Sequence, residues 1–219
     1  MLFDFGGTLD AAGIPWKERV FRLYRAEGVT ISPERFDPVF YRVDDALVGT
    51  IGETLSFRET VHRLVGGVSA ALGVDAERTE RIAQRFVESA CASVSQNSLL
   101  LSRLAGRYQL GLVSNFYGNL ATVCDDVGIR ALFDVIVDST CVGWRKPDRR
   151  IFEHALRGVG VAPANAAFVG DSPSRDMHGA RDVGMAHIWL AGEGLQRRAP
   201  CCPGDRVLSS LAELGGLLL

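Results

Sequence analysis

Short apolar runs alternate with helical stretches through the second half of this sequence, and this alternation restricts the possible folds more than any other feature. Each run suits one buried strand, and each stretch between runs suits one helix. Strands joined in this way lie parallel in one sheet with helices on its faces. Residues 1–5 supply one more apolar run. The pattern predicts an α/β fold with a parallel sheet, whose other strands lie at residues 110–113, 133–137, 166–169 and 186–190.

The segment between Asp10 and about Asn97 has a helical pattern and none of the apolar runs found on either side of it. Signals for helix starts and ends within it predict four helices. They are a glycine after an amphipathic stretch (Gly28), a serine before a proline (Ser32-Pro33), a capping box (Ser56 to Glu59) and an aspartate cap (Asp75). We therefore expect a core made of residues 1–12 and 97–219, with an all-α unit inserted over residues 13–96.

Reactive side chains follow several of the predicted strands. Asp4 ends the first run and is followed by two glycines, Ser114 ends the second run, and Asp171 ends the run at 166–169 with Asp176 one helical turn later. The carboxyl ends of parallel strands meet at one edge of a sheet, where such folds bind ligands. Lys146 is one of only two lysines among 24 lysines and arginines, and a compact ammonium is not interchangeable with a guanidinium. A carboxylate nucleophile, a hydroxyl, an ammonium and two further acids suit phosphoryl transfer.

The order and local sequence of these segments resemble the haloacid dehalogenase superfamily of hydrolases. The matching segments are Asp4 to Thr8, Ser114, Lys146 before Pro147, and Gly170-Asp171 with Asp176. Together they extend over most of the chain. The resemblance implies a Rossmann-like parallel sheet core with an all-α cap inserted after the first segment. It also implies that Asp4 attacks a small phosphorylated metabolite and forms an aspartyl-phosphate intermediate.

Attack by a carboxylate on a phosphoryl group requires the charge of the substrate to be neutralised, usually by a divalent cation with oxygen ligands. Mg²⁺ suits such a site because it prefers oxygen ligands and keeps several waters. We expect one oxygen of Asp4, the backbone carbonyl of Gly6, Asp171 and Asp176 to bind it, the last directly or through water. Because Gly6 contributes a carbonyl, its lack of a side chain does not affect this prediction.

Ser114 and Lys146 are the other expected catalytic residues. The Ser114 hydroxyl is placed to donate to a phosphoryl oxygen, and Lys146 offsets charge on the phosphoryl group and on Asp4. Asn115 and Thr8 are expected to contact the bound phosphate or its loops, Asn115 by orienting Lys146 and Thr8 by a hydrogen bond within the first loop.

Each of these residues also has a structural interpretation. An acid in the position of Asp171 caps helices, and one in the position of Asp176 complements a helix dipole. Ser114 and Asn115 suit turns, and a lysine in a loop is usually exposed. The occurrence of all these residues in one chain favours the functional interpretation.

One position departs from the family pattern. In family phosphatases the second Asp of the first segment protonates the leaving group and later activates water, and here that residue is Gly6. Such acid or base assistance is worth ~10² to 10⁴ in rate. We therefore expect slow hydrolysis of alkyl phosphates and faster hydrolysis of aryl, acyl or anhydride phosphates. We also expect Gly6→Asp to raise turnover on an aryl phosphate. Asp10 is interpreted as a cap for the next segment rather than as a replacement acid.

Two other functions fit the sequence. Family members that hydrolyse carbon–halogen or carbon–phosphorus bonds also lack the second Asp. However, the dehalogenases generally lack the Gly170-Asp171 pair, and the phosphonate branch needs a cap lysine, for which only Lys17 is available. The second alternative is a catalytically weak or silent module that binds a phosphorylated ligand or a protein partner. Retention of Asp4, Lys146 and Asp171 favours an enzyme over this module.

Composition restricts the partners and the compartment. The net charge of -2 supplies no basic field for nucleic acid, and no run approaches the ~18 apolar residues of a membrane span. Neither nucleic acid nor membrane is an expected partner. Five cysteines without zinc-site spacing are interpreted as reduced thiols of a cytoplasmic protein. Trp16 is interpreted as a core or solvated residue. The sequence leaves open the substrate, the oligomeric state and whether the natural start lies upstream of Met1.

Overall fold

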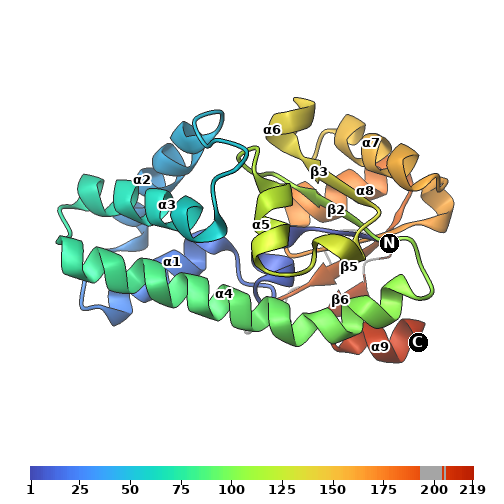
Figure 1. The fold of residues 1–219 in the computed structure, drawn as a ribbon, viewed down its shortest axis with the longest axis horizontal. Helices are drawn as coiled ribbons and strands as arrows, with labels where there is room; N and C mark the ends of the chain where they lie inside the picture. Colours follow the sequence, from blue (N-terminus) through green and yellow to red (C-terminus); the bar gives the residue numbers. More distant parts are fainter. Residues whose placement is uncertain (193–203, 205) are drawn as a thin grey trace.

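A computed structural model describes residues 1–192, 204 and 206–219 and contains one parallel sheet of six strands in the order β3-β2-β1-β4-β5-β6 (Figure 1). This confirms the predicted α/β class and parallel sheet. Five of the strands fall on the predicted runs. The sixth, β6, is short and begins with an arginine, so no apolar run marks it. The strands are β1 (Leu2–Phe3), β2 (Gly111–Ser114), β3 (Val135–Asp138), β4 (Ala167–Gly170), β5 (Ala186–Leu190) and β6 (Arg206–Leu208).

The strand order reverses at β1, which lies between β2 and β4. The chain therefore runs outward in one direction from β1 through β2 to β3, and in the other through β4 and β5 to β6. In doubly wound sheets the crevice at such a reversal, at the carboxyl ends of the strands, is the usual place for a ligand. Asp4 directly follows β1 and Asp171 directly follows β4, so both acids lie at this crevice.

Two apolar layers cover the two faces of the sheet. Successive residues of a strand point to opposite faces, and accordingly Leu2 packs with Phe152 and Phe168 while Phe3 packs in the other cluster with Phe133. Burial on both faces explains why the strands appear in the sequence as continuous apolar runs. The helices of this half are α5 (Leu120–Asp126), α6 (Ser139–Val142), α7 (Arg149–Val159), α8 (His178–Val183) and α9 (Glu213–Leu218).

Four helices between β1 and β2 form a group beside the sheet, which we call the helical unit (Figure 1). The capping box predicted at Ser56 is present, since its side chain accepts from the Glu59 amide while the Glu59 carboxylate accepts from the Ser56 amide. Ser32 and Asp75 stand at the predicted N-cap positions of their helices. The unit consists of α1 (Trp16–Ala26), α2 (Pro33–Leu47), α3 (Phe57–Leu72) and α4 (Ala76–Ala105).

Helix α4 extends beyond the helical unit. It has 30 residues and runs from the helical unit to the side of the sheet near α9 (Figure 1, green). The boundary proposed between residues 96 and 97 therefore falls inside an unbroken helix. No glycine or proline interrupts the sequence before Gly106. Leu101 and Leu104 are buried, so the last turns of the helix pack against the rest of the protein.

The structure places three of the five cysteines. Cys91, Cys124 and Cys141 are free thiols, and Cys201 and Cys202 lie outside the described residues. Within the described ranges, none of the helices combines the length and the apolar character needed to cross a bilayer.

Candidate active site

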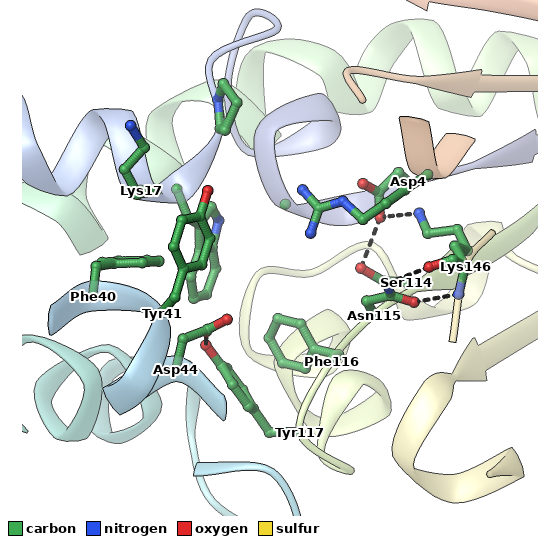
Figure 2. Close-up of a pocket in the computed structure, with 14 residues that line it drawn as sticks. Asp4, Lys17, Phe40, Tyr41, Asp44, Ser114, Asn115, Phe116, Tyr117 and Lys146 are labelled. Atoms are coloured by element: carbon green, nitrogen blue, oxygen red, sulfur yellow. Dashed lines mark hydrogen bonds and ion pairs between the residues drawn. The ribbon is translucent and has the colours of Figure 1, made fainter. Parts of the chain in front are cut away.

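Asp4 lies just beyond β1, and one of its two carboxylate oxygens is tightly held. Its Oδ1 accepts hydrogen bonds from the Phe5 amide at 2.8 Å and the Ser114 hydroxyl at 2.7 Å, and the Lys146 ammonium lies 2.8 Å from the same atom. Figure 2 shows the contacts with Ser114 and Lys146. All three contacts converge on Oδ1. The carboxylate is thereby fixed in orientation, and Oδ2 is left for a ligand.

Lys146 is buried between two carboxylates. Its ammonium lies 2.8 Å from Asp4 and 2.7 Å from Asp176. Burial alone lowers the pKa of Lys146, but Asp176 and Asp4 raise it above its usual value, so the side chain is an ammonium. Asn115 holds the lysine backbone from both sides, because its Oδ1 accepts from the Lys146 amide at 2.7 Å and its Nδ2 donates to the Lys146 carbonyl at 3.1 Å. These two contacts fix the backbone at Lys146, and a role of Asn115 toward a bound phosphate stays a prediction.

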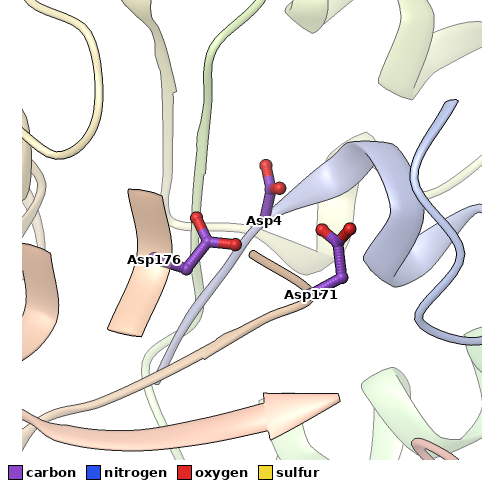
Figure 3. Close-up of side chains that lie close together, drawn as sticks. All are labelled: Asp4, Asp171 and Asp176. Carbon is purple, nitrogen blue, oxygen red and sulfur yellow. The ribbon is translucent and has the colours of Figure 1, made fainter. Parts of the chain in front are cut away.

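Three carboxylates meet beside Lys146. Asp4, Asp171 and Asp176 each offer an oxygen within 4.8 Å of the others, and the three lie close together in Figure 3. Lys146 and the nearby Arg175 guanidinium bring two positive charges against three negative ones, so one formal negative charge is left over. Burial, followed by the charges of Asp176 and Asp4, raises the pKa of Asp171 well above its usual value. The Oδ2 atom of Asp171 is buried and has no hydrogen-bond donor. A cation fits this cluster, because it would supply both the missing charge and the missing partner.

The turn after Asp4 brings the first loop against Asp171. Gly7 has a φ of +86°, and a Cβ at this position would lie 2.6 Å from Asp171 Oδ2. Only glycine therefore fits both the backbone conformation and the close approach. Thr8 is fully buried and its hydroxyl donates to Asp171 Oδ1 at 3.3 Å. Thr8 is placed against Asp171 and does not line the pocket in front of Asp4.

The space beside Gly6 is filled by an indole. A Cβ on Gly6 would lie 3.2 Å from Trp16 Nε1. That nitrogen donates to Asp10 Oδ2 at 2.6 Å, and Arg19 lies 2.8 Å from the same oxygen. Asp10 Oδ1 accepts from the Gly7 amide at 2.7 Å. Asp10 is therefore a buried tether for Trp16 rather than the cap of the next segment that the sequence predicts. The gain expected from Gly6→Asp requires Trp16 to move.

A pocket in front of Asp4 is lined by residues of both halves of the molecule (Figure 2). Sequence patterns place Trp16 in the core or in solvent, and they carry no signal for the aromatic and charged residues beside it. A helical sequence does not show which side chains face a residue on another element. The only available signal is the position of Arg175 directly before Asp176. The lining residues not assigned from the sequence are Pro15, Trp16, Lys17, Phe40, Tyr41, Asp44, Phe116, Tyr117 and Arg175.

The arrangement of these segments matches a known protein family. A model of the family described as "Haloacid dehalogenase-like hydrolase" matches residues 1–190. The chain belongs to this family. The match extends from the first strand to the end of β5. It therefore includes the three clustered acids, Asp4, Asp171 and Asp176, and Lys146.

Curated relatives cover parts of the chain. A haloacid dehalogenase-like hydrolase domain-containing protein 3 from Bos taurus is 46% identical over 84 residues, which are 38% of this chain and 34% of that protein. A phosphoserine phosphatase from Thermus thermophilus is 39% identical over 87 residues, which are 40% of this chain and 34% of that enzyme. These matches thus span about a third of the length of each relative.

Solved structures share the whole fold at low sequence identity. The HAD-hydrolase YfnB from Bacillus subtilis, solved with bound magnesium, covers 99% of this chain and 96% of its own, with a TM-score of 0.59 and 18% identity. The fold of this chain is therefore that of the haloacid dehalogenase-like hydrolases.

Proposed function

We propose that this protein is a magnesium-dependent phosphohydrolase that transfers the phosphoryl group of a small phosphorylated metabolite to Asp4 and then to water. The geometry of Asp4 carries the proposal. Three donors hold Oδ1, and the carboxylate lines an open pocket. A carboxylate with one oxygen fixed and the other directed to a ligand is arranged for nucleophilic attack.

Mg²⁺ would be held by Asp4, the Gly6 carbonyl, Asp171 and Asp176. The support for this part of the proposal is the buried Oδ2 of Asp171, which has no donor, together with the surplus negative charge of the three acids. When bound, the cation supplies charge neutralisation for an incoming phosphoryl group. Thr8 would orient Asp171 for this role, whereas the sequence predicts a hydrogen bond within the first loop.

Ser114 and Lys146 would stabilise the transferring group. Both side chains touch Asp4 and both line the pocket, so a phosphoryl group on Asp4 meets a hydroxyl and an ammonium at once. Asn115 keeps the Lys146 backbone in place. Glycine at position 6 removes acid and base assistance worth ~10² to 10⁴ in rate, so turnover on unactivated alkyl phosphates is expected to be slow.

The rival functions receive less support. A Schiff-base mechanism of carbon–phosphorus cleavage would need a neutral lysine, but Lys17 lies 3.0 Å from Asp37, and although burial lowers its pKa, Asp37 and Glu18 raise it above the usual value. A metal-free dehalogenase would leave the buried Oδ2 of Asp171 without a partner. A silent module would not need the open oxygen of Asp4. The substrate is proposed to be a small cytoplasmic molecule.

The proposal is tested by incubating the protein with p-nitrophenyl phosphate, with and without Mg²⁺, and measuring released phosphate and phosphate bound to protein. We expect release only with Mg²⁺, and a phosphorylated peptide containing Asp4 in quenched samples. Asp4→Asn serves as the control and should show neither signal. Halide release from a 2-haloacid without Mg²⁺, or magnesium binding without turnover on a broad panel of phosphates, would contradict the proposal.

A further inference from the structure

Five aromatic side chains line the pocket next to Asp4. Trp16 and Phe116 have ring centroids 5.7 Å apart at an interplanar angle of 80°, and Phe116 and Tyr117 lie 5.0 Å apart. Phe40 and Tyr41 contribute from α2, and Tyr41 is half exposed (Figure 2). Aromatic pairs in edge-to-face or offset geometry add about 0.5–1.5 kcal/mol beyond the burial of their area. This lining favours a ligand that carries an aromatic ring.

Trp16 is held rigidly within this lining. Its Nε1 donates to the fully buried Asp10, which Arg19 also contacts. Its ring packs edge-on against Phe86 at 5.1 Å, and Phe57 lies 6.2 Å away. The indole therefore cannot leave the side of Gly6 without losing a buried hydrogen bond and these ring contacts.

Most ionisable groups of the lining other than Asp4 are held in ion pairs or hydrogen bonds. Lys17 is paired with Asp37, and Lys146 is shared by Asp4 and Asp176. Asp44 accepts the hydrogen bond of the Tyr117 hydroxyl, and in Figure 2 this pair lies at the far end of the pocket from Asp4. Arg175 lines the pocket too, but a guanidinium does not give up its proton. Tyr41 carries a half-exposed phenol, which is a weak acid. Among the other described lining residues, none is both free and acidic enough to protonate a leaving group beside Asp4.

We infer that Trp16 is the specificity-determining residue of this site, and that it selects phosphate esters of phenols, whose aromatic leaving group packs against the indole and departs without protonation. This inference rests on the proposed phosphohydrolase function. Two independent features support it, namely the aromatic lining and the engagement of the ionisable groups. Phenols form stable anions, whereas alkyl alcohols do not, so only the former leave readily from an unassisted site.

The chemical balance of the reaction requires no further reagent. A bond forms between an Asp4 oxygen and phosphorus while the bond between phosphorus and the aryl oxygen breaks, and the electron pair leaves on the aryloxide. Water then attacks phosphorus and the bond to Asp4 breaks, which restores the carboxylate. The water loses one proton to solvent and the aryloxide gains one, so the products are a phenol and inorganic phosphate.

The ring contact is tested with inhibitors that have no leaving group. Phenylphosphonate and cyclohexylphosphonate are compared as competitive inhibitors in the presence of Mg²⁺. We expect phenylphosphonate to bind roughly 2- to 12-fold more tightly to the natural protein, the range that corresponds to one aromatic pair. Trp16→Leu keeps an apolar side chain and should remove this preference. Equal inhibition by the two compounds in the natural protein, or an unchanged preference in a folded Trp16→Leu variant, overturns the inference.

The effect of the indole on acid catalysis is tested by introducing Gly6→Asp into the natural protein and into the Trp16→Leu variant. Gly6→Asp alone should gain little on n-propyl phosphate, because the new Cβ lies 3.2 Å from the indole nitrogen. The double variant Gly6→Asp with Trp16→Leu should exceed Trp16→Leu by about 10²-fold or more. An equal gain from Gly6→Asp alone overturns the steric part of the inference.

These outcomes separate the inference from the function on which it rests. If the natural protein hydrolyses no phosphate ester in the presence of Mg²⁺, the proposed function fails. If it hydrolyses aryl and alkyl phosphates equally well, or acetyl phosphate much better than p-nitrophenyl phosphate, the function stands and the selection of aromatic leaving groups by Trp16 is wrong.

Discussion

Two buried acidic groups lie beside the first loop, one with three carboxylates and one with a single carboxylate and its partners. We call them the first and the second cluster, and they differ in how fully their negative charge is paired. In the first, Asp4, Asp171 and Asp176 face two positive charges, the Lys146 ammonium and the Arg175 guanidinium. In the second, Asp10 alone receives an amide, an indole N–H and a guanidinium. The first cluster has more negative charge than the protein neutralises, and the second has none left over.

The pKa shifts reflect the same difference. Burial raises the pKa of both Asp10 and Asp171. At Asp10 the charge of Arg19 and the hydrogen bonds that follow it all lower the pKa again. At Asp171 the next largest effects are the charges of Asp176 and Asp4, and both raise the pKa further. A carboxylate with matched partners stabilises a fold, while a group of acids with too few partners marks a place where a ligand completes the structure. Substituting each acid by the isosteric asparagine tests this distinction.

The largest effect is expected for Asp4→Asn. The amide is a poor nucleophile, so kcat should fall by about 10⁴-fold or more. Because the asparagine side chain keeps an oxygen for the Ser114 and Phe5 donors, the melting temperature should change little. Steady-state kinetics and circular dichroism measure the two quantities, and retained turnover would show that Asp4 is not the nucleophile.

Asp10→Asn should instead lower the stability of the fold more than it changes kcat. It removes the negative charge that pairs with the largely buried Arg19, and breaking such a pair costs about 3 kcal/mol. We expect a lower midpoint in urea with an unchanged slope. Asp182→Asn, which alters an exposed acid next to Arg181, is the control and should leave the midpoint within error. A stable Asp10→Asn variant would remove the distinction between the two clusters.

Magnesium should stabilise only through the first cluster. A ligand at one hundred times its dissociation constant adds about 2.7 kcal/mol to the free energy of unfolding. Thermal unfolding in Mg²⁺ and in EDTA measures this difference. Asp10 is not a ligand, so Asp10→Asn should retain the magnesium increment on its lower baseline, whereas Asp171→Asn should lose it.

The smallest expected effect is that of Asp171→Asn on the free energy of unfolding without metal. Its sign should be opposite to that of Asp10→Asn. This change removes a charge that burial and two neighbouring acids disfavour, while Oδ1 still accepts from Thr8. We expect a stabilisation on the order of 1 kcal/mol in EDTA. Destabilisation of similar size would mean that the three acids are already balanced in the metal-free protein.

Much of the fold follows from local sequence patterns. Strands β2 to β5 coincide with apolar runs because both faces of the sheet are buried, and the capping box at Ser56 is a local motif that tertiary structure does not override. The end of α4 is harder to place, because residues after Asn97 continue the helical pattern without a stop signal until Gly106.

The site is only partly readable from the sequence. Asp4, Ser114 and Asp171 follow strands, and parallel strands bring their ends together, so their proximity is a consequence of topology. Trp16 lies on a helix, and no local pattern shows which element its ring faces. The difference between Asp10 and Asp171, both acids near glycines, depends on Arg19 and Trp16 folding back onto one of them.

Helix α4 joins the helical unit, where its Phe86 packs against Trp16, to the side of the sheet near α9. At 1.5 Å per residue its 30 residues form a rod of about 45 Å. Just past its end, Arg107 and Tyr108 donate to the carbonyl groups of Leu219 and Leu218. If the helical unit tilted when a ligand binds, this long helix would carry the displacement along its length. The displacement would be felt at the carboxyl terminus, where a spin label or a fluorophore would report on occupancy of a distant catalytic centre.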